Sequence, residues 1–168
     1  MWMGSKAVVA QILLDRAWQT ALQTGTPPKL WASMDAKPIA KISVPALNRE
    51  AIILEGSSGQ ALAFGPAHMS GTPLPGQPGT SIISAHKNTH FDFLKHLKTG
   101  DSFKIQLSSG STQIYKITGA EIVHYEHSNI PMVSANNAPS RVVLVTCYPF
   151  DRLSYGGPLR YVVYAELT

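Results

Sequence analysis

The stretch Arg141-Val-Val-Leu-Val-Thr-Cys147 is the most strand-like run of the chain, and Tyr148-Pro149 follows it directly. Branched aliphatic side chains and threonine favour a strand in which most positions are buried. A proline has no amide hydrogen to donate to a β-ladder, so Pro149 should end the strand. Cys147 therefore occupies a strand-to-loop junction at the rim of a sheet, where a substrate can reach the thiol.

Outward from this strand, the chain from Pro38 onward consists of short apolar runs separated by turn residues, which predicts a mainly β fold. Residues 56–79 are dense in Gly, Pro and Ser and should hold a turn or a short helix beside irregular loop. Residues 91–97 fit one or two helical turns. The predicted strands span residues 39–44, 50–54, 80–85, 102–107, 112–124, 142–147 and 159–167.

The N-terminal segment has a different periodicity. Apolar residues between Lys6 and Leu22 recur at spacings of three and four, and Gly25-Thr-Pro-Pro28 stops the pattern. This predicts an amphipathic helix, which either packs on the domain or lies on a membrane; its polar face lacks the Lys/Arg content typical of membrane-surface helices. We divide the chain into an N-terminal helix and linker, residues 1–37, and a β-rich domain, residues 38–168.

The composition limits the classes of function. The chain has 168 residues, 44% apolar and 14% charged, which suits one compact domain and is too apolar for disorder. Lys and Arg are scattered, with no basic run interleaved with aromatic residues, so we expect no nucleic-acid partner. The net charge of +4 favours an anionic membrane surface or cell envelope. No run approaches the roughly 18 to 20 apolar residues that span a bilayer.

The single cysteine excludes an intramolecular disulfide, so Cys147 is a buried small hydrophobe, a metal ligand, a handle for dimerisation or a reactive thiol. Arg160 opens the next predicted strand, and a guanidinium beside a thiol favours thiolate and stabilises an oxyanion. A surface ion pair explains Arg160 equally well. His86 ends the strand 80–85 and can transfer protons near neutral pH, although a strand-end histidine is often structural.

Two pairs of histidines have spacings that occur in metal sites: His86 with His90, and His124 with His127. Zinc is the obvious ion to consider. The chain has one cysteine and no H-E-x-x-H motif, so the ligands would have to come from several segments. We therefore predict no metal site, and no cofactor.

The order and setting of these residues resemble the sortase family. Val145-Thr146-Cys147 is similar to the end of the family's T-L-x-T-C strand motif, Arg160 lies on the following strand, and His86 lies upstream after a small-residue apolar strand. The resemblance covers residues 38–168. Further matches are Gly65-Pro-Ala-His68 with G-P-x-H, Pro75-Gly-Gln-Pro-Gly79 with P-G-x-x-G, and His86-Lys-Asn-Thr-His-Phe91 with H-R-D-T-x-F.

Two positions depart from the family pattern. Leu144-Val145 stands in the T-L-x portion, so the first threonine of the longer motif is absent. Asn88 stands where many relatives carry aspartate, which puts in doubt a charged partner for His86 at that position. Neither departure touches the three reactive groups.

The resemblance implies an eight-stranded mixed β-barrel with short helices, and a cysteine transpeptidase that cleaves an LPxTG-like sorting signal between Thr and Gly. Cys147 would be the nucleophile, His86 the general acid and base, and Arg160 a donor to the substrate or its oxyanion. The thioacyl intermediate would pass to an amine acceptor from a cell-wall precursor or another protein.

The resemblance also implies a location. The chain resembles proteobacterial, class D/E-like sortases, which implies a location in the cell envelope, at the extracytoplasmic face of the plasma (inner) membrane. In that comparison the N-terminal helix resembles the segment that follows a membrane anchor, so we expect anchorage in the full-length protein.

Family position suggests residues that bind the substrate. Thr146, beside the nucleophile, is expected to position the scissile peptide, the alternative being an ordinary β-branched strand residue. Ile130, Pro131, Met132 and Val133 lie in the long loop before the cysteine strand. Long loops inside compact domains are often functional, so these four are candidates to receive the leucine and proline of the signal.

Other functions stay open. A papain-like hydrolase places cysteine before histidine and uses Asn or Asp as its third member, whereas His86 here precedes Cys147. A cysteine peptidase that acts mainly by hydrolysis would use the same residues as a transpeptidase. A non-catalytic envelope β-barrel binding module would carry Cys147 as an inert, buried residue.

Overall fold

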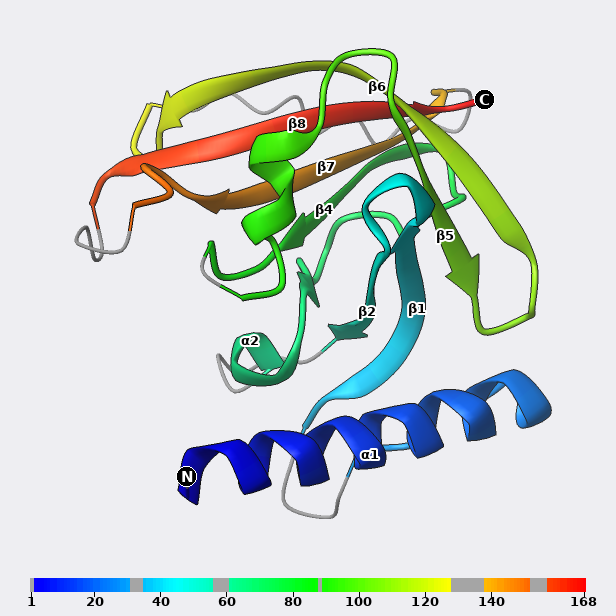
Figure 1. Cartoon of the computed structure of the whole chain (residues 1–168). Coiled ribbons are helices and arrows are strands. Elements are labelled where there is room, and N and C mark those ends of the chain that lie inside the picture. Colours follow the sequence, from blue (N-terminus) through cyan, green and yellow to red (C-terminus); the bar gives the residue numbers. More distant parts are fainter. Residues whose placement is uncertain (1, 31–34, 56–60, 88, 128–137, 152–156) are drawn as a thin grey trace.

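A computed structural model describes residues 2–30, 35–55, 61–87, 89–127, 138–151 and 157–168, with side chains of the first helix from Val8 onward. Its strands form a closed barrel in the order β1-β2-β3-β4-β7-β8-β6-β5 (Figure 1). β2 pairs with β3 and β4 with β7 in parallel, and every other neighbouring pair is antiparallel. The eight-stranded mixed barrel expected from the resemblance is confirmed.

Every strand that the sequence predicts is present. Three of them, β5, β6 and β8, have the predicted bounds, and the helical turns expected around residues 91–97 form a 3-10 helix. The eighth strand, β3, has only two residues and was not predicted, because so short a strand has no alternation of its own. The strands are β1 (Lys37–Val44), β2 (Arg49–Glu55), β3 (Ala67–His68), β4 (Gly79–Ser84), β5 (Ser102–Leu107), β6 (Thr112–His124), β7 (Ser140–Cys147) and β8 (Leu159–Leu167); the helices are α1 (Trp2–Thr24), η1 (Pro45–Leu47), α2 (Ala61–Phe64) and η2 (Asp92–His96).

The barrel interior is filled by aliphatic and aromatic side chains that alternate along the strands. On β5, for example, Phe103 and Ile105 are fully buried, whereas Ser102 and Lys104 are exposed. The ring of Phe103 stacks on Tyr115 of β6 at 5.8 Å between centroids. Successive side chains of a strand point to opposite faces, so one set forms the core and the other lies on the outer surface.

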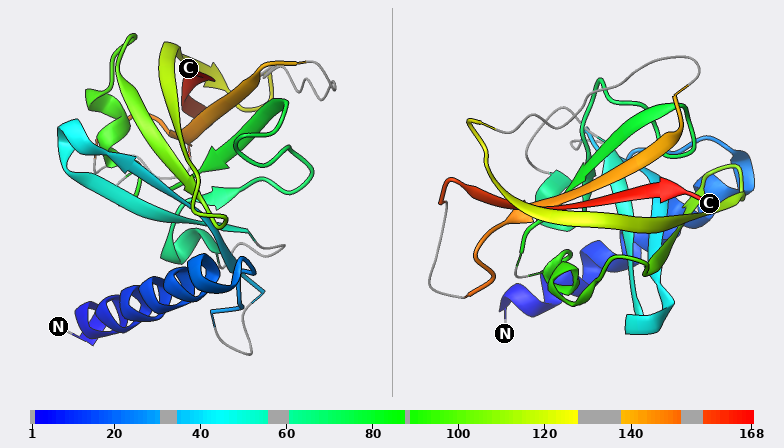
Figure 2. Two further views of the ribbon diagram at one scale, coloured as in Figure 1. Left: turned by 90° about the vertical axis from the view of Figure 1, so that its right-hand side faces the viewer. Right: turned by 90° about the horizontal axis from the view of Figure 1, so that it is seen from above.

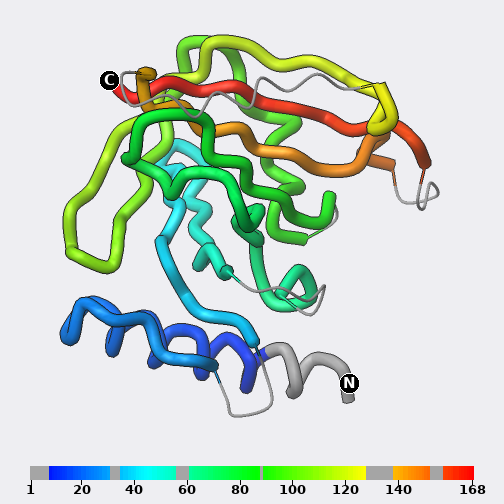
Figure 3. Tube along the Cα trace, turned by 180° about the vertical axis from the view of Figure 1, so that it is seen from behind, coloured from blue at the N-terminus to red at the C-terminus, as the bar shows by residue number. Residues whose placement is uncertain are grey.

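Helix α1 lies across the outside of the barrel, beside β1 and β2, as Figures 2 and 3 show from the side and from behind. Its inner face buries Leu14, Trp18 and Ala21 in a second apolar cluster, together with Ile52 and Leu54 of β2. The predicted amphipathic helix is confirmed, and within the described part of the chain it packs on the domain. Among the described residues, no helix is long and apolar enough to cross a membrane.

Truncation of the inner face of α1 should destabilise the protein. Leu14 is 2% exposed, so Leu14→Ala should lower the free energy of unfolding by about 2–5 kcal/mol through lost burial and a cavity. Ile12, 46% exposed on the same helix, is the matched control, and Ile12→Ala should change it by no more than about 0.5 kcal/mol. Urea unfolding followed by tryptophan fluorescence measures both; equal losses would show that α1 does not pack as described.

Candidate active site

The pairing of β7 with β8 brings Cys147 beside Arg160. The two residues are register partners at the end of the antiparallel pair, at the left of Figure 1. Inward positions of β7, such as Val142 and Leu144, belong to the barrel core. Successive side chains of a strand point to opposite faces, and Cys147 lies an odd number of residues from these core positions. Its side chain therefore projects to the outer face. The same argument places Arg160 on that face, since its neighbours Val163 and Ala165 of odd number are core residues.

The parallel pairing of β4 with β7 brings His86 to the same end. Ser84 is the register partner of Val145, and the pairing continues one residue further, because the Ala85 amide donates to the Val145 carbonyl at 3.1 Å. Ala85 is a core residue, and His86, which follows it, is exposed. The pairing of β4 with β7 thus ends one residue before His86, at the end of the barrel where Cys147 and Arg160 are register partners.

The three groups differ in exposure and in partners. His86 is exposed, and Cys147 is a half-buried free thiol. The Nη1 of Arg160 donates to the carbonyls of Gly157 at 2.7 Å and Leu159 at 2.9 Å. Its guanidinium carbon lies 5.3 Å from the centre of the Tyr125 ring, a cation–π distance. Arg160 is therefore held at the barrel rim by its own loop and by the residue that follows β6.

Thr146 makes a buried hydrogen bond to a neighbouring segment that the sequence did not predict. The side chain is 2% exposed, and its hydroxyl donates to the Ala85 carbonyl at 2.6 Å. Lys87 makes a second tie between the same two segments, since its Nζ donates to the Pro149 carbonyl at 2.6 Å. These bonds join the two residues that flank His86 to Thr146, directly before Cys147, and to Pro149, two residues after it. The expectation that Thr146 also contacts the scissile peptide stays a prediction.

The segment after His86 is fixed by a charged anchor from β2. Arg49 makes a two-pronged ion pair with the Asp92 carboxylate, at 2.5 and 3.4 Å, and also donates to the Thr89 carbonyl at 3.2 Å. Such a paired guanidinium holds both partners in one orientation. Burial, then the charges of His86 and Arg49, lower the pKa of His90 from its ordinary 6.5, and Asp92 opposes them.

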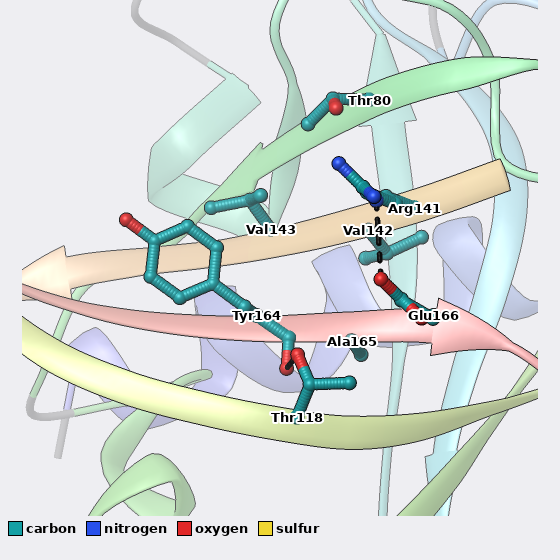
Figure 4. A pocket seen from close by; sticks show the side chains of 8 residues that line it. All are labelled: Thr80, Thr118, Arg141, Val142, Val143, Tyr164, Ala165 and Glu166. Atoms are coloured by element: carbon teal, nitrogen blue, oxygen red, sulfur yellow. Dashed lines mark hydrogen bonds and ion pairs between the residues drawn. The ribbon is translucent and has the colours of Figure 1, made fainter. Parts of the chain in front are cut away.

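A hollow lies at the opposite end of the same outer face, lined by β4, β6, β7 and β8 (Figure 4). Arg141 and Glu166 form an ion pair there at 3.2 Å. Burial and the Glu121 carboxylate, which accepts a hydrogen bond from the phenol, raise the pKa of Tyr164 to about 12. Arg141 lies six residues from Cys147 along β7, roughly 20 Å at the rise of a strand. The hollow is therefore separate from His86, Cys147 and Arg160.

The other predicted substrate residues, Ile130, Pro131, Met132 and Val133, lie outside the described residues. The structure adds two residues that sequence reasoning missed, Tyr125 over Arg160 and Lys87 beside His86. Neither residue has a local sequence signal, because each contacts a segment that is distant along the chain. One group of side chains offers metal-ligand atoms among the described residues, at the end of β6 next to Tyr125.

An eight-stranded mixed barrel with Cys, His and Arg at neighbouring strand ends is the architecture that the sequence resemblance implied. A family model of the sortase domain matches residues 42–168. The chain belongs to the sortase family. It is 31% identical over 125 residues to sortase D of Bacillus subtilis (strain 168), an alignment that covers 74% of this chain and 61% of that relative. The chain thus spans about three fifths of the length of this curated relative.

Solved sortase structures have the same fold. Sortase C-1 from Actinomyces oris matches with a TM-score of 0.67 and 26% identity, over 78% of this chain and 72% of its own. Sortase A from Corynebacterium diphtheriae matches with a TM-score of 0.69 and 23% identity, over 96% of this chain and 85% of its own. At 23% identity, the similarity to sortase A supports the fold alone.

Removal of the Thr146 hydroxyl should loosen the barrel at this end. Thr146→Val keeps the shape but leaves the buried Ala85 carbonyl without its donor, so the free energy of unfolding should fall by about 1–3 kcal/mol. Thr146→Ser keeps the hydroxyl and should lose less. Urea denaturation compares the two; an equal or greater loss in the serine variant would show that the hydroxyl bond does not stabilise the strand ends.

The lowered pKa of His90 predicts a loss of stability in acid. The folded protein disfavours the charged imidazole, so the contribution of His90 is complete above pH 6.5 and is lost as the pH falls through the folded pKa. Nuclear magnetic resonance titration of the histidine rings, with His90→Gln to assign the signal, should give a midpoint below 6.5. A midpoint at or above that value would contradict the burial of this ring beside Arg49.

Proposed function

We propose that this chain is a sortase-type cysteine transpeptidase, which cleaves an LPxTG-like sorting signal between Thr and Gly and transfers the acyl part to an amine. One observation carries the proposal: Cys147 and Arg160 are register partners, and His86 follows the strand that pairs with β7. Membership of the sortase family supports it. So does the structure of Clostridium perfringens sortase C with the C-terminal cell wall sorting motif, which this chain resembles in fold with a TM-score of 0.69.

The first half-reaction forms a thioester. The Cys147 thiolate attacks the carbonyl carbon of the signal's threonine, and the carbonyl oxygen takes the electron pair as an oxyanion. His86, as imidazolium, gives its proton to the leaving amine as the C–N bond breaks. The carboxyl-terminal part of the signal departs as a free amine, and the rest stays on Cys147.

The second half-reaction consumes the thioester. An incoming amine attacks the thioester carbonyl, neutral His86 takes its proton, and the C–S bond breaks to return the Cys147 thiolate. The product is a new amide, so the energy of the cleaved peptide bond is retained rather than lost to water. A cell-wall precursor or another protein supplies the amine in this proposal.

Arg160 stabilises the oxyanion in both halves. Within the described residues, the two bonds to Gly157 and Leu159 both use Nη1, so Nε and Nη2 are the donors proposed to face the substrate carbonyl. A planar guanidinium supplies two parallel donors, which a lysine ammonium does not. Tyr125 and the two carbonyls orient the fork before the substrate arrives, so little entropy is lost in the transition state.

The remaining assignments follow the family position. We propose that Thr146 lies beside the scissile peptide, with its hydroxyl committed to Ala85, and that Ile130, Pro131, Met132 and Val133 receive the leucine and proline of the signal. Residues 38–168 form the catalytic unit, and residues 1–37 connect it to an anchor in the plasma (inner) membrane. The protein would act in the cell envelope, on the extracytoplasmic face.

Replacement of each reactive group should abolish or weaken cleavage of a fluorogenic LPxTG-like peptide. Cys147→Ala should abolish both cleavage and the thioacyl adduct that mass spectrometry detects on the native protein. His86→Ala should leave a trace of activity at most. Arg160→Ala should lower kcat/KM about 10²–10³-fold, and Arg160→Lys should rescue little of it.

Arg141 gives a matched control, because it is an arginine on the same face of the barrel at its far end. Arg141→Ala should keep cleavage near that of the native protein. Each protein is assayed with and without an added amine. If the peptide is only hydrolysed even when an amine is present, the protein is a peptidase rather than a transpeptidase. If Cys147 forms no thioacyl adduct and the peptide stays intact, the protein is a binding module.

A further inference from the structure

The chain makes a tight turn directly after β6, at residues 124–127. The His127 amide donates to the His124 carbonyl at 2.9 Å, which closes the turn, and the Glu126 amide donates to His124 Nδ1 at 3.2 Å. The two imidazole rings lie 4.9 Å apart between centroids, with their planes 36° apart. The turn therefore gathers two imidazoles and a carboxylate on four consecutive residues.

We propose that this turn binds a divalent transition-metal ion of the zinc class through His124, Glu126 and His127. The ligand atoms of the three side chains lie within 4.8 Å of one another. Ligand bonds to zinc are about 2.0–2.2 Å long, so two ligands of one ion lie roughly 3 to 4 Å apart. Rotation of side chains closes this difference, since Glu126 and His127 are exposed.

The donor set selects the class of ion. Imidazole nitrogens suit Zn²⁺, Ni²⁺ and Cu²⁺, whereas Ca²⁺ and Mg²⁺ prefer sets made wholly of oxygen. Three protein ligands leave a coordination position for water. Coordination through Nδ1 of His124 replaces the hydrogen bond from the Glu126 amide. The sequence alone predicted no metal site, because it did not show that a turn would bring the ligand atoms of Glu126 and the two histidines close together in space.

The ion would hold a turn that already contacts β8 near Arg160. His124 is the register partner of Leu159 on β8, and the Tyr125 amide donates to the Pro158 carbonyl at 2.9 Å. The Tyr125 hydroxyl donates to Glu126 at 2.9 Å, and its ring lies over Arg160. A ligand that binds only the folded turn stabilises the whole fold by mass action.

The test measures metal binding without reference to activity. Zinc is titrated by calorimetry into Cys147→Ala protein that carries no polyhistidine tag, so that neither the thiol nor a tag supplies ligands. We expect saturable one-to-one binding and a rise in Tm. In the same background, His127→Ala and Glu126→Gln should weaken binding by at least about tenfold, a loss that even outer-shell partners of a metal can cause.

His96→Ala is the matched control, because His96 is an exposed histidine on η2 outside the turn, and it should bind zinc as before. Absence of saturable binding would overturn the proposal, as would binding that survives His127→Ala unchanged or binding of Ca²⁺ tighter than that of Zn²⁺. The outcome is independent of the proposed transpeptidation, since the nucleophile is removed from every protein in the series.

Discussion

The parallel contact between β4 and β7 determines which side chains gather at the end of the barrel that holds Cys147. Parallel neighbours fix a register, and the register decides which side chains share a face. Here it brings the segment that leads into His86 to the end of β7 where Cys147 lies, and the antiparallel partner β8 places Arg160 opposite Cys147. A slip of one residue in β7 would turn the thiol into the core. The buried bond from Thr146 to Ala85 opposes such a slip.

A second buried hydroxyl fixes the other end of β7. Tyr115 accepts the Gly76 amide at 2.7 Å and shares a hydrogen bond with Ser140, the first residue of β7, at 3.0 Å. Burial raises the pKa of the Tyr115 phenol, so the hydroxyl stays a neutral donor and acceptor. The strand that carries the cysteine is thus held by polar contacts at both ends and by apolar packing between them.

Much of this arrangement could be predicted from the sequence, because it follows from local pattern. The alternation of apolar and polar residues predicted the bounds of β5, β6 and β8. The positions of His86, Cys147 and Arg160 at the ends of three apolar runs marked them as candidates for the site. The two-residue β3 could not be found, since its pairing depends on tertiary neighbours. Two other contacts could not be predicted for the same reason: the packing of Tyr125 on Arg160, and the hydrogen bond from the Thr146 hydroxyl to the Ala85 carbonyl. Groups that meet across strands have no fixed separation in sequence.

The β4–β7 contact joins segments about 61 residues apart in the chain. Contacts of such separation form late, because the entropy of closing the intervening loop must be lost before the pairing gains anything. Until then, the imidazole and the thiol belong to separate parts of an open sheet. Assembly of His86, Cys147 and Arg160 at one end of the barrel is therefore coupled to closure of the barrel, and a chain whose barrel has not closed does not bring these three side chains together.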